Sequence, residues 1–363
     1  MKRNYYAPAL MALVAAANLL IPAPANGQQA GGRATDATVK AKGPAVSGAA
    51  VKTVVKTVAD DGTLSLPASD AVALIDMRRL LTEAVPRALV NDAARAAEVN
   101  ADIEQFKTRT GIDARAFDRV AVGAQLTNPS ANVTKIDNVV AIAHGTFDQA
   151  ALVASGKLAA KGKHQEATYG GKTVHIFNIN DRVKLFGLMP SIKVNDLALS
   201  VLDANTVAVG DPAGVRAAID ARDGRGRVSG ELVALARRNV NAVIGFGGVV
   251  PPSLTKNLDL GSESIAQSIA SIKQFYGSVG TSADGFDMLT VLRTGSAGDA
   301  KTLSDTLTSL KQLAPLFLAQ FSGQRGKLAQ SAVNSLKVTT EGSEVQLRLA
   351  LAQSDIAQAV RVF

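Results

Sequence analysis

The chain has 363 residues, of which 47% are hydrophobic, enough for one large domain or two of ordinary size and too apolar for a disordered chain. It contains no cysteine, which excludes disulfides, thiolate nucleophiles, thiolate metal sites and a lipid-bearing cysteine. The formal net charge is +8, so the position of the excess basic residues decides whether an anionic partner is expected.

The first 25 residues have the pattern of an export signal. Lys2 and Arg3 precede an apolar run at 7–20, Pro22 ends that run before it is long enough to span a bilayer, and residues 23–25 offer a small-residue cleavage site. No later run of the sequence is long and apolar enough for a membrane helix, so we expect no transmembrane anchor after cleavage. The sequence predicts a periplasmic or secreted protein.

Most of the basic excess lies outside the folded part. Residues 26–58 hold five basic residues and one acidic residue, a net charge of +4, and cleavage removes a further +2 with Lys2 and Arg3. The composition of 26–65, rich in Ala, Gly, Thr and Lys, is typical of a basic low-complexity linker, with contact to anionic lipid as the alternative. With no tryptophan and 4% aromatic residues, stacking grooves are disfavoured and we expect no nucleic-acid partner.

Residues 66–223 predict a first α+β module. Its expected elements are a strand at 71–75, helices at 77–89 and 92–110, strands at 119–124 and 138–143 flanking a polar loop at 126–137, a helix from a capping box at 146–149 to Gly156, a hairpin at 164–177, strands at 197–202 and 206–210, and a helix at 212–222. The hairpin is expected to turn at Gly170 and Gly171, which tolerate the positive φ angles of a two-residue turn.

Residues 242–363 predict a second module of the same order, after a glycine-rich hinge at 224–241. Its expected elements are a strand at 242–246, a helix at 262–275, strands at 277–282 and 286–293, a helix that follows Ser296, strands at 336–340 and 345–351, and a short helix from Ser354. The predicted fold is α+β, with two tandem copies of an antiparallel sheet covered by helices on one face. Whether the copies share one sheet is left open.

The three histidines are the first candidates for chemistry. None has a partner three or four residues away, but pairing about the Gly170 turn places His175 opposite Glu166 and His164 opposite Phe177. This pattern favours a cross-strand charge pair, because a metal site would need a further ligand that the pattern does not supply. We therefore expect no metal and no cofactor.

Catalytic motifs are weak. Ser253 and Lys256 match the Ser-x-x-Lys pattern of penicillin-binding enzymes, but the accompanying Ser-Asp-Asn and Lys-Thr-Gly elements are missing from the sequence. The glycines at 245–248 are followed by Pro251 and Pro252, which disfavours a dinucleotide-binding turn. No catalytic residue is assigned, and a non-enzymatic protein is favoured.

Two groups of side chains are candidates for binding. Arg222, Arg225 and Arg227 lie among glycines and offer an anion clamp, with a solvated hinge as the alternative. An apolar helix end offers a wall for a protein partner or lipid-like ligand, with core packing as the alternative. Its residues are Leu313, Phe317 and Phe321.

Residues 66–86, 110–123, 169–177 and 207–220 together resemble a group of uncharacterised exported bacterial proteins catalogued only as domains of unknown function. The resemblance covers most of the mature chain and implies an envelope or secreted protein. The resemblance rests on the general sequence pattern of these segments and not on a catalytic motif, so it supplies no active site.

The leading hypothesis is an exported, non-enzymatic binding or structural protein of the cell envelope, whose partner is an unidentified protein or envelope component. A carrier that holds an apolar small molecule or lipid between the two modules is the second hypothesis. A serine hydrolase using Ser253 and Lys256 is the third.

Overall fold

The computed structural model describes residues 63–110, 113–130, 133–183, 192–252, 263–318 and 323–355. The strands are β1 (Ala71–Asp76), β2 (Phe117–Ser130), β3 (Val133–Gly145), β4 (His164–Tyr169), β5 (Lys172–Val183), β6 (Ile192–Asp203), β7 (Thr206–Gly210), β8 (Ile244–Val249), β9 (Ile272–Thr281), β10 (Gly285–Thr294), β11 (Lys337–Glu341) and β12 (Glu344–Ala352).

The helices are short, apart from α4 and α10. They are α2 (Met77–Arg79), α3 (Val85–Leu89), α4 (Ala93–Thr110), α5 (Gln149–Ala159), α6 (Pro212–Arg222), α7 (Gly230–Ala236), α9 (Glu263–Ala270), α10 (Ala297–Leu318) and α11 (Gly323–Ser335), with 3-10 turns η1 (Thr63–Ser65) and η3 (Ala114–Ala116) and a π-helical turn η2 (Leu80–Ala84).

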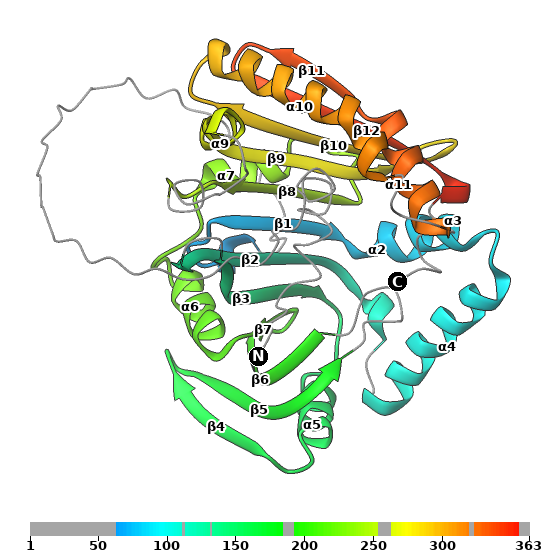
Figure 1. Cartoon of the computed structure of the whole chain (residues 1–363). Helices are drawn as coiled ribbons and strands as arrows, with labels where there is room; N and C mark the ends of the chain where they lie inside the picture. The colour runs from blue at the N-terminus through cyan, green and yellow to red at the C-terminus, as the bar shows by residue number, and fades with distance from the viewer. Residues whose placement is uncertain are drawn as a thin grey trace, which may run out of the picture.

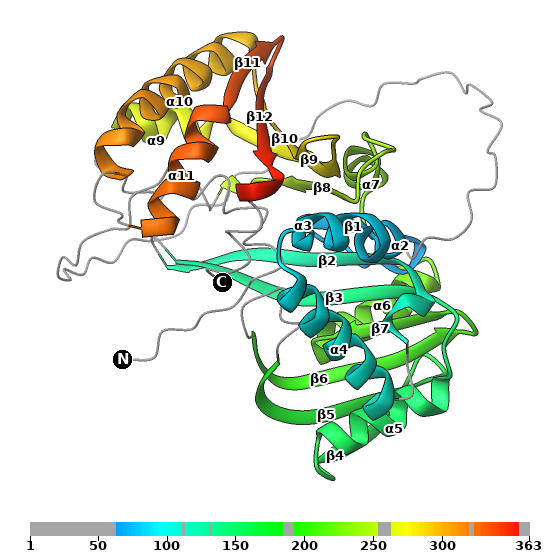
Figure 2. The ribbon, with the colours of Figure 1, turned by 90° about the vertical axis from the view of Figure 1, so that its right-hand side faces the viewer.

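The twelve strands found among the described residues form one sheet, in the order β11-β12-β10-β9-β8-β1-β2-β3-β7-β6-β5-β4. Every neighbouring pair is antiparallel. The sheet runs the length of the molecule from β11 to β4 (Figure 1), and the strands at its two ends run in different directions because the sheet twists (Figure 2). The predicted α+β class with antiparallel strand pairing is confirmed, and the strands of both predicted modules belong to one large sheet.

Helices cover both faces of this sheet. The largest core cluster joins Ala198 of β6 to Val215 of α6 and Leu232 of α7, whereas a second cluster joins the next residue of β6, Leu199, to Val153 of α5. Successive strand residues point to opposite faces, so α5 lies on the face opposite α6. The expectation that helices cover only one face was therefore wrong, because alternate apolar residues of β5–β7 point to both sides and each side needs a cover.

Two further predictions about local structure were wrong. The stretch 126–137 was expected to be a polar loop, but β2 continues to Ser130 and β3 begins at Val133. The expected helix at 262–275 ends at Ala270, and β9 begins at Ile272. In both places hydrogen-bonded pairing with a neighbouring strand decides the structure over local polarity or helical spacing.

The segment 224–241, expected to be a hinge, contains the helix α7. Ser229 caps it by accepting a hydrogen bond from the Glu231 N–H, and its own Leu232 and Leu235 are buried. This segment therefore packs on the sheet. Among the residues that the structure describes, no helix is both long enough and apolar enough to cross a membrane.

Candidate functional site

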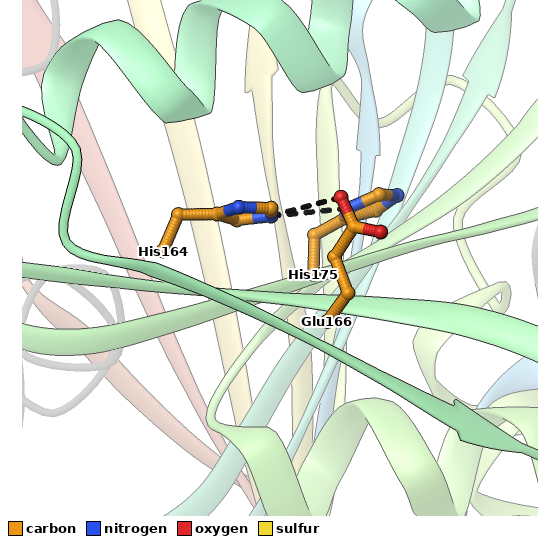
Figure 3. A group of neighbouring side chains, drawn as sticks. All are labelled: His164, Glu166 and His175. Atoms are coloured by element: carbon orange, nitrogen blue, oxygen red, sulfur yellow. Dashed lines mark hydrogen bonds and ion pairs between the residues drawn. The ribbon is translucent and has the colours of Figure 1, made fainter.

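A cluster of polar side chains lies on the hairpin β4–β5, at the edge of the sheet. Gly170 and Gly171, with φ of 54° and 70°, turn the hairpin and set its register, which pairs His175 with Glu166 and His164 with Phe177 as predicted. Because side chains two residues apart share a strand face, His164 lies on the same face as Glu166. The three side chains converge (Figure 3).

One nitrogen of each imidazole and one carboxylate oxygen lie at nearly equal distances from one another. His164 Nε2 is 3.3 Å from His175 Nδ1, and Glu166 Oε1 is 3.4 Å from each of these nitrogens. The imidazoles are mostly buried, with 14% and 13% of their side-chain surface exposed, whereas the Glu166 side chain is 48% exposed. The cluster is therefore open to solvent on its carboxylate side.

Sequence reasoning placed His175 beside Glu166 but found no further ligand. The structure adds His164, which is the residue that reasoning missed. The signal was present in the sequence, because the spacing of two residues between His164 and Glu166 already puts them on one face of a strand.

Helix α5 covers this face of the hairpin and holds the rings in place. Asp148 caps the helix by accepting hydrogen bonds from two backbone N–H groups, and Lys157 reaches from its last turn to within 3.1 Å of Glu166 Oε1. The Phe177 ring stacks on His164 at a centroid distance of 5.2 Å. A Cβ on Gly156 would lie 2.3 Å from Phe177 Cζ, so only glycine allows this approach of helix and hairpin.

The surroundings of Glu166 and His175 favour the unprotonated carboxylate and the uncharged imidazole. The hydrogen bond from Lys157, together with its charge, lowers the pKa of Glu166 below its usual value. Burial lowers the pKa of His175, and this effect outweighs the opposing attraction of Glu166. At neutral pH the carboxylate is therefore anionic and His175 is neutral.

An open pocket of about 860 Å³ adjoins the cluster beneath α5. Polar side chains of α5, β5 and the end of β6 line it alongside apolar ones, and His175 belongs both to the pocket and to the cluster. The polar lining residues are Gln149, Lys157, Lys172, Thr173, His175 and Asp203.

The arginines expected to clamp an anion contact acceptors of the chain itself. Arg222 pairs with Asp203, Arg225 lies 2.6 Å from Asp220, and Arg227 Nε donates to the Ala221 carbonyl oxygen. These contacts fasten the end of α6 to its surroundings. A role for the three arginines in binding stays a prediction.

The other candidates lie partly outside the described residues. Leu313 is exposed on α10, at 46% of its surface, while the side chain of Phe317 and the whole of Phe321 lie outside the described residues. Ser253 and Lys256 also lie outside them. Their proposed roles stay predictions.

A second polar cluster, not found from the sequence, is formed by side chains of β9, β10, β12 and the segment just after α7. Tyr276 Oη donates to Glu344 Oε2 at 2.8 Å, and Arg293 donates to Glu344 Oε1 at 2.9 Å. The Arg238 guanidinium lies 4.8 Å above the Tyr276 ring and donates to its hydroxyl. Burial and the hydrogen bond to Glu344 raise the pKa of Tyr276 to about 12.

No family model and no curated protein matches the chain, in keeping with a resemblance to proteins catalogued only as domains of unknown function. Among solved structures, crystal form I of TP0453 is similar at 8% identity and a TM-score of 0.41, covering 85% of this chain and 99% of that one. Crystal form III gives 9% identity, a TM-score of 0.43, and 85% and 100% coverage. Crystal form IV gives 9%, 0.42, and 85% and 97%.

Proposed function

We propose that this chain is an exported protein of the cell envelope, periplasmic or secreted, that binds a ligand without transforming it. The export-type pattern of the first 25 residues supports the location. The pocket beneath α5, with the cluster of His164, Glu166 and His175 beside it, supports the binding function.

The observation that carries the binding function is the convergence of three ligand atoms beside the pocket. His164 Nε2, His175 Nδ1 and Glu166 Oε1 lie 3.3–3.4 Å from one another, and His175 also lines the pocket. The pKa values of Glu166 and His175 are lowered by their surroundings, so at neutral pH the carboxylate is anionic, the imidazole is uncharged, and each offers an electron pair. Such groups are suited to holding an electron-poor ligand.

We also propose that the sheet consists of two related halves that meet at the β1–β8 pair. Outward from that pair the order is β1-β2-β3-β7-β6 on one side and β8-β9-β10-β12-β11 on the other. Directly paired residues form one row in each half: Leu74, Ala121, Ile142, Ala208 and Ser200 in the first, and Gly247, Tyr276, Val291, Gln346 and Thr339 in the second.

The strand ends support this correspondence. In both rows the second strand begins four residues before its row residue, the third ends three residues after, and the fourth begins two residues before. The described part of the second half has no counterpart of the β4–β5 hairpin between its third and fourth strands. The candidate site therefore lies on an addition to the shared scaffold, which is where a function particular to one half belongs.

Export is tested by expressing the full chain, with its own N-terminus, in a Gram-negative host and fractionating the cells. We expect a shortened chain beginning near Asn26 in the periplasm or medium. The matched control replaces Lys2 and Arg3 with Glu, which removes the positive start of the signal, and should leave the chain unprocessed in the cytoplasm. Unprocessed wild-type chain in the cytoplasm contradicts the proposal.

Binding is tested by native mass spectrometry of the processed chain purified from the envelope fraction. A bound mass that is released on denaturation supports the binding function and identifies the ligand class. A bare chain that also gains no mass from the soluble extract of the same fraction contradicts it.

A further inference from the structure

We propose that His164, Glu166 and His175 form a site for one divalent transition-metal ion of the zinc class. His164 Nε2, His175 Nδ1 and Glu166 Oε1 are the ligand atoms. The inference rests on the geometry of the hairpin and is independent of where the chain is exported.

The separations of the three donor atoms fit one shared cation. A tetrahedral zinc ion with bonds of 2.0–2.1 Å separates any two of its ligand atoms by about 3.3–3.4 Å. The observed separations of 3.3, 3.4 and 3.4 Å match three edges of that tetrahedron. The three atoms therefore mark one triangular face of a zinc site.

The competing explanation is a set of hydrogen bonds, and the same distances disfavour it. A hydrogen bond between a charged carboxylate and an N–H group is typically about 2.7–2.9 Å long. Glu166 Oε1 lies 3.4 Å from both imidazole nitrogens, too far for a strong bond to either one. The three atoms are spaced as the ligands of one shared ion are, and each imidazole can serve as a ligand in the tautomer that turns an unprotonated nitrogen toward that ion.

The chemistry of the ligand atoms selects the class of metal. Two imidazole nitrogens and one carboxylate oxygen suit zinc and its neighbours in the transition series, and Mg²⁺ and Ca²⁺ favour sites made of oxygen alone. Three protein ligands leave the fourth position of a tetrahedral ion for water or a small ligand. Because His175 also lines the pocket, an incoming ligand has a route to that position.

The surroundings prepare the site for a cation, with one exception. Phe177 stacks on His164, and α5 packs closely over the hairpin, so the rings are already oriented. The exception is Lys157, whose ammonium group lies 3.1 Å from the same Glu166 oxygen and repels a cation. Its side chain is 47% exposed, which gives it room to turn toward solvent when an ion binds.

The test is isothermal titration of the chain from residue 26 onward, purified without a polyhistidine tag, with zinc chloride alone. We expect one ion per chain, and affinity reduced at least about 10-fold in His164→Gln and in Glu166→Gln. His144→Gln is the matched control, because His144 also lies beside a carboxylate, Asp118 at 4.0 Å, but outside the cluster. Its affinity should equal that of the wild type.

Cobalt supplies a second readout that does not depend on heat of binding. Co²⁺ in a four-coordinate site gives intense visible absorption. We expect this absorption in the wild type and in His144→Gln, and we expect Glu166→Gln to lose it. Because the Glu166 side chain is 48% exposed, this substitution leaves the core intact. Absence of zinc binding in the folded wild type overturns the inference. So does equal weakening by His144→Gln, since the ion would then bind at no particular histidine.

Discussion

The two polar clusters of this molecule differ in the balance between donors and acceptors. Around Tyr276, the Glu344 carboxylate receives hydrogen bonds from a tyrosine and an arginine, and two guanidinium groups flank the ring. At the β4–β5 hairpin, one carboxylate and two imidazole nitrogens face one another, and the cation beside them is the exposed Lys157.

This difference separates a structural cluster from a binding cluster. In the Tyr276 cluster the charges are matched within the protein, so removal of one member leaves others unpaired and destabilises the fold. In the hairpin cluster one carboxylate oxygen faces two imidazole nitrogens and an exposed lysine, and the proposed metal ion takes the position between the three ligand atoms. Substitutions in the first cluster should change stability, and substitutions in the second should change binding.

The largest expected effect is on stability, in Glu344→Leu. Burial alone would raise the pKa of Glu344, but hydrogen bonds from Tyr276 and Arg293 outweigh it and lower that pKa, so the carboxylate is ionised and paired in the fold. Its loss should lower the free energy of unfolding by about 3 kcal/mol, measured by urea denaturation.

Glu341→Leu is the control for this substitution, because Glu341 is exposed at the end of β11. It should change the free energy of unfolding by no more than about 0.5 kcal/mol. Equal losses in the two variants would show that the Tyr276 cluster contributes nothing beyond an ordinary surface glutamate.

The same cluster predicts a loss of stability at alkaline pH. The folded pKa of Tyr276 is about 12, above the usual value of 10.0, so its contribution is complete below pH 10 and is lost as the pH rises through the folded value. Between pH 9.5 and 12, the free energy of unfolding of Tyr276→Phe should fall by about 2 kcal/mol less than that of the wild type. Chemical denaturation at each pH measures this.

Tyr169→Phe provides the comparison for that experiment. Its hydroxyl donates to Asp220, and this hydrogen bond raises the pKa of Tyr169, but the ring lies at the edge of the sheet instead of in its core. We expect a smaller alkaline difference. A difference as large as that of Tyr276→Phe would mean that burial is not the cause.

A third substitution tests how the scaffold supports the hairpin cluster. Gly156→Ala adds a Cβ that would lie 2.3 Å from Phe177 Cζ, so α5 or the hairpin must shift. The higher helix propensity of alanine offsets part of the cost of this shift, so the free energy of unfolding should fall by about 1 kcal/mol. Zinc binding should also weaken.

Gly298→Ala is its control, since a Cβ there would lie 3.7 Å from its nearest neighbour, Ser296 Oγ, in ordinary contact. That variant should become more stable by up to about 1 kcal/mol and bind zinc as the wild type does. Weaker binding in both variants would show that the loss at Gly156 is not due to displacement of the hairpin.

Local signals predicted part of the fold, and long-range pairing determined the rest. The β4–β5 hairpin was predicted because two glycines and alternating side chains define it within a few residues. The start of β9 was not predicted, because 272–275 has the spacing of a helix and becomes a strand only through its pairing with β8 and β10. Helix α7 had a local signal, because Ser229 is a typical N-cap residue and leucines follow it. The glycines of the same segment led to the prediction of a hinge instead.

The candidate site shows the same division. Strand pairing alone put His175 opposite Glu166, and strand alternation put His164 on the same face, so its members were available from the sequence. Their separations were not, because these depend on α5 packing against Phe177. The Tyr276 cluster was beyond sequence reasoning, since Arg238 lies just after α7, Tyr276 on β9 and Glu344 on β12, and these segments meet only in the assembled sheet.

The smallest expected effect is the most specific for the hairpin cluster. Lys157→Met removes the ammonium group beside Glu166, so a bound cation no longer meets repulsion or competition for Oε1, and zinc affinity should rise severalfold, measured by titration. Lys301→Met removes the same charge from an exposed pair with Asp305 on α10, 3.0 Å apart, and should leave zinc affinity unchanged. If Lys157→Met instead weakens zinc binding, the lysine supports the site and does not compete with the cation, which contradicts the expected repulsion.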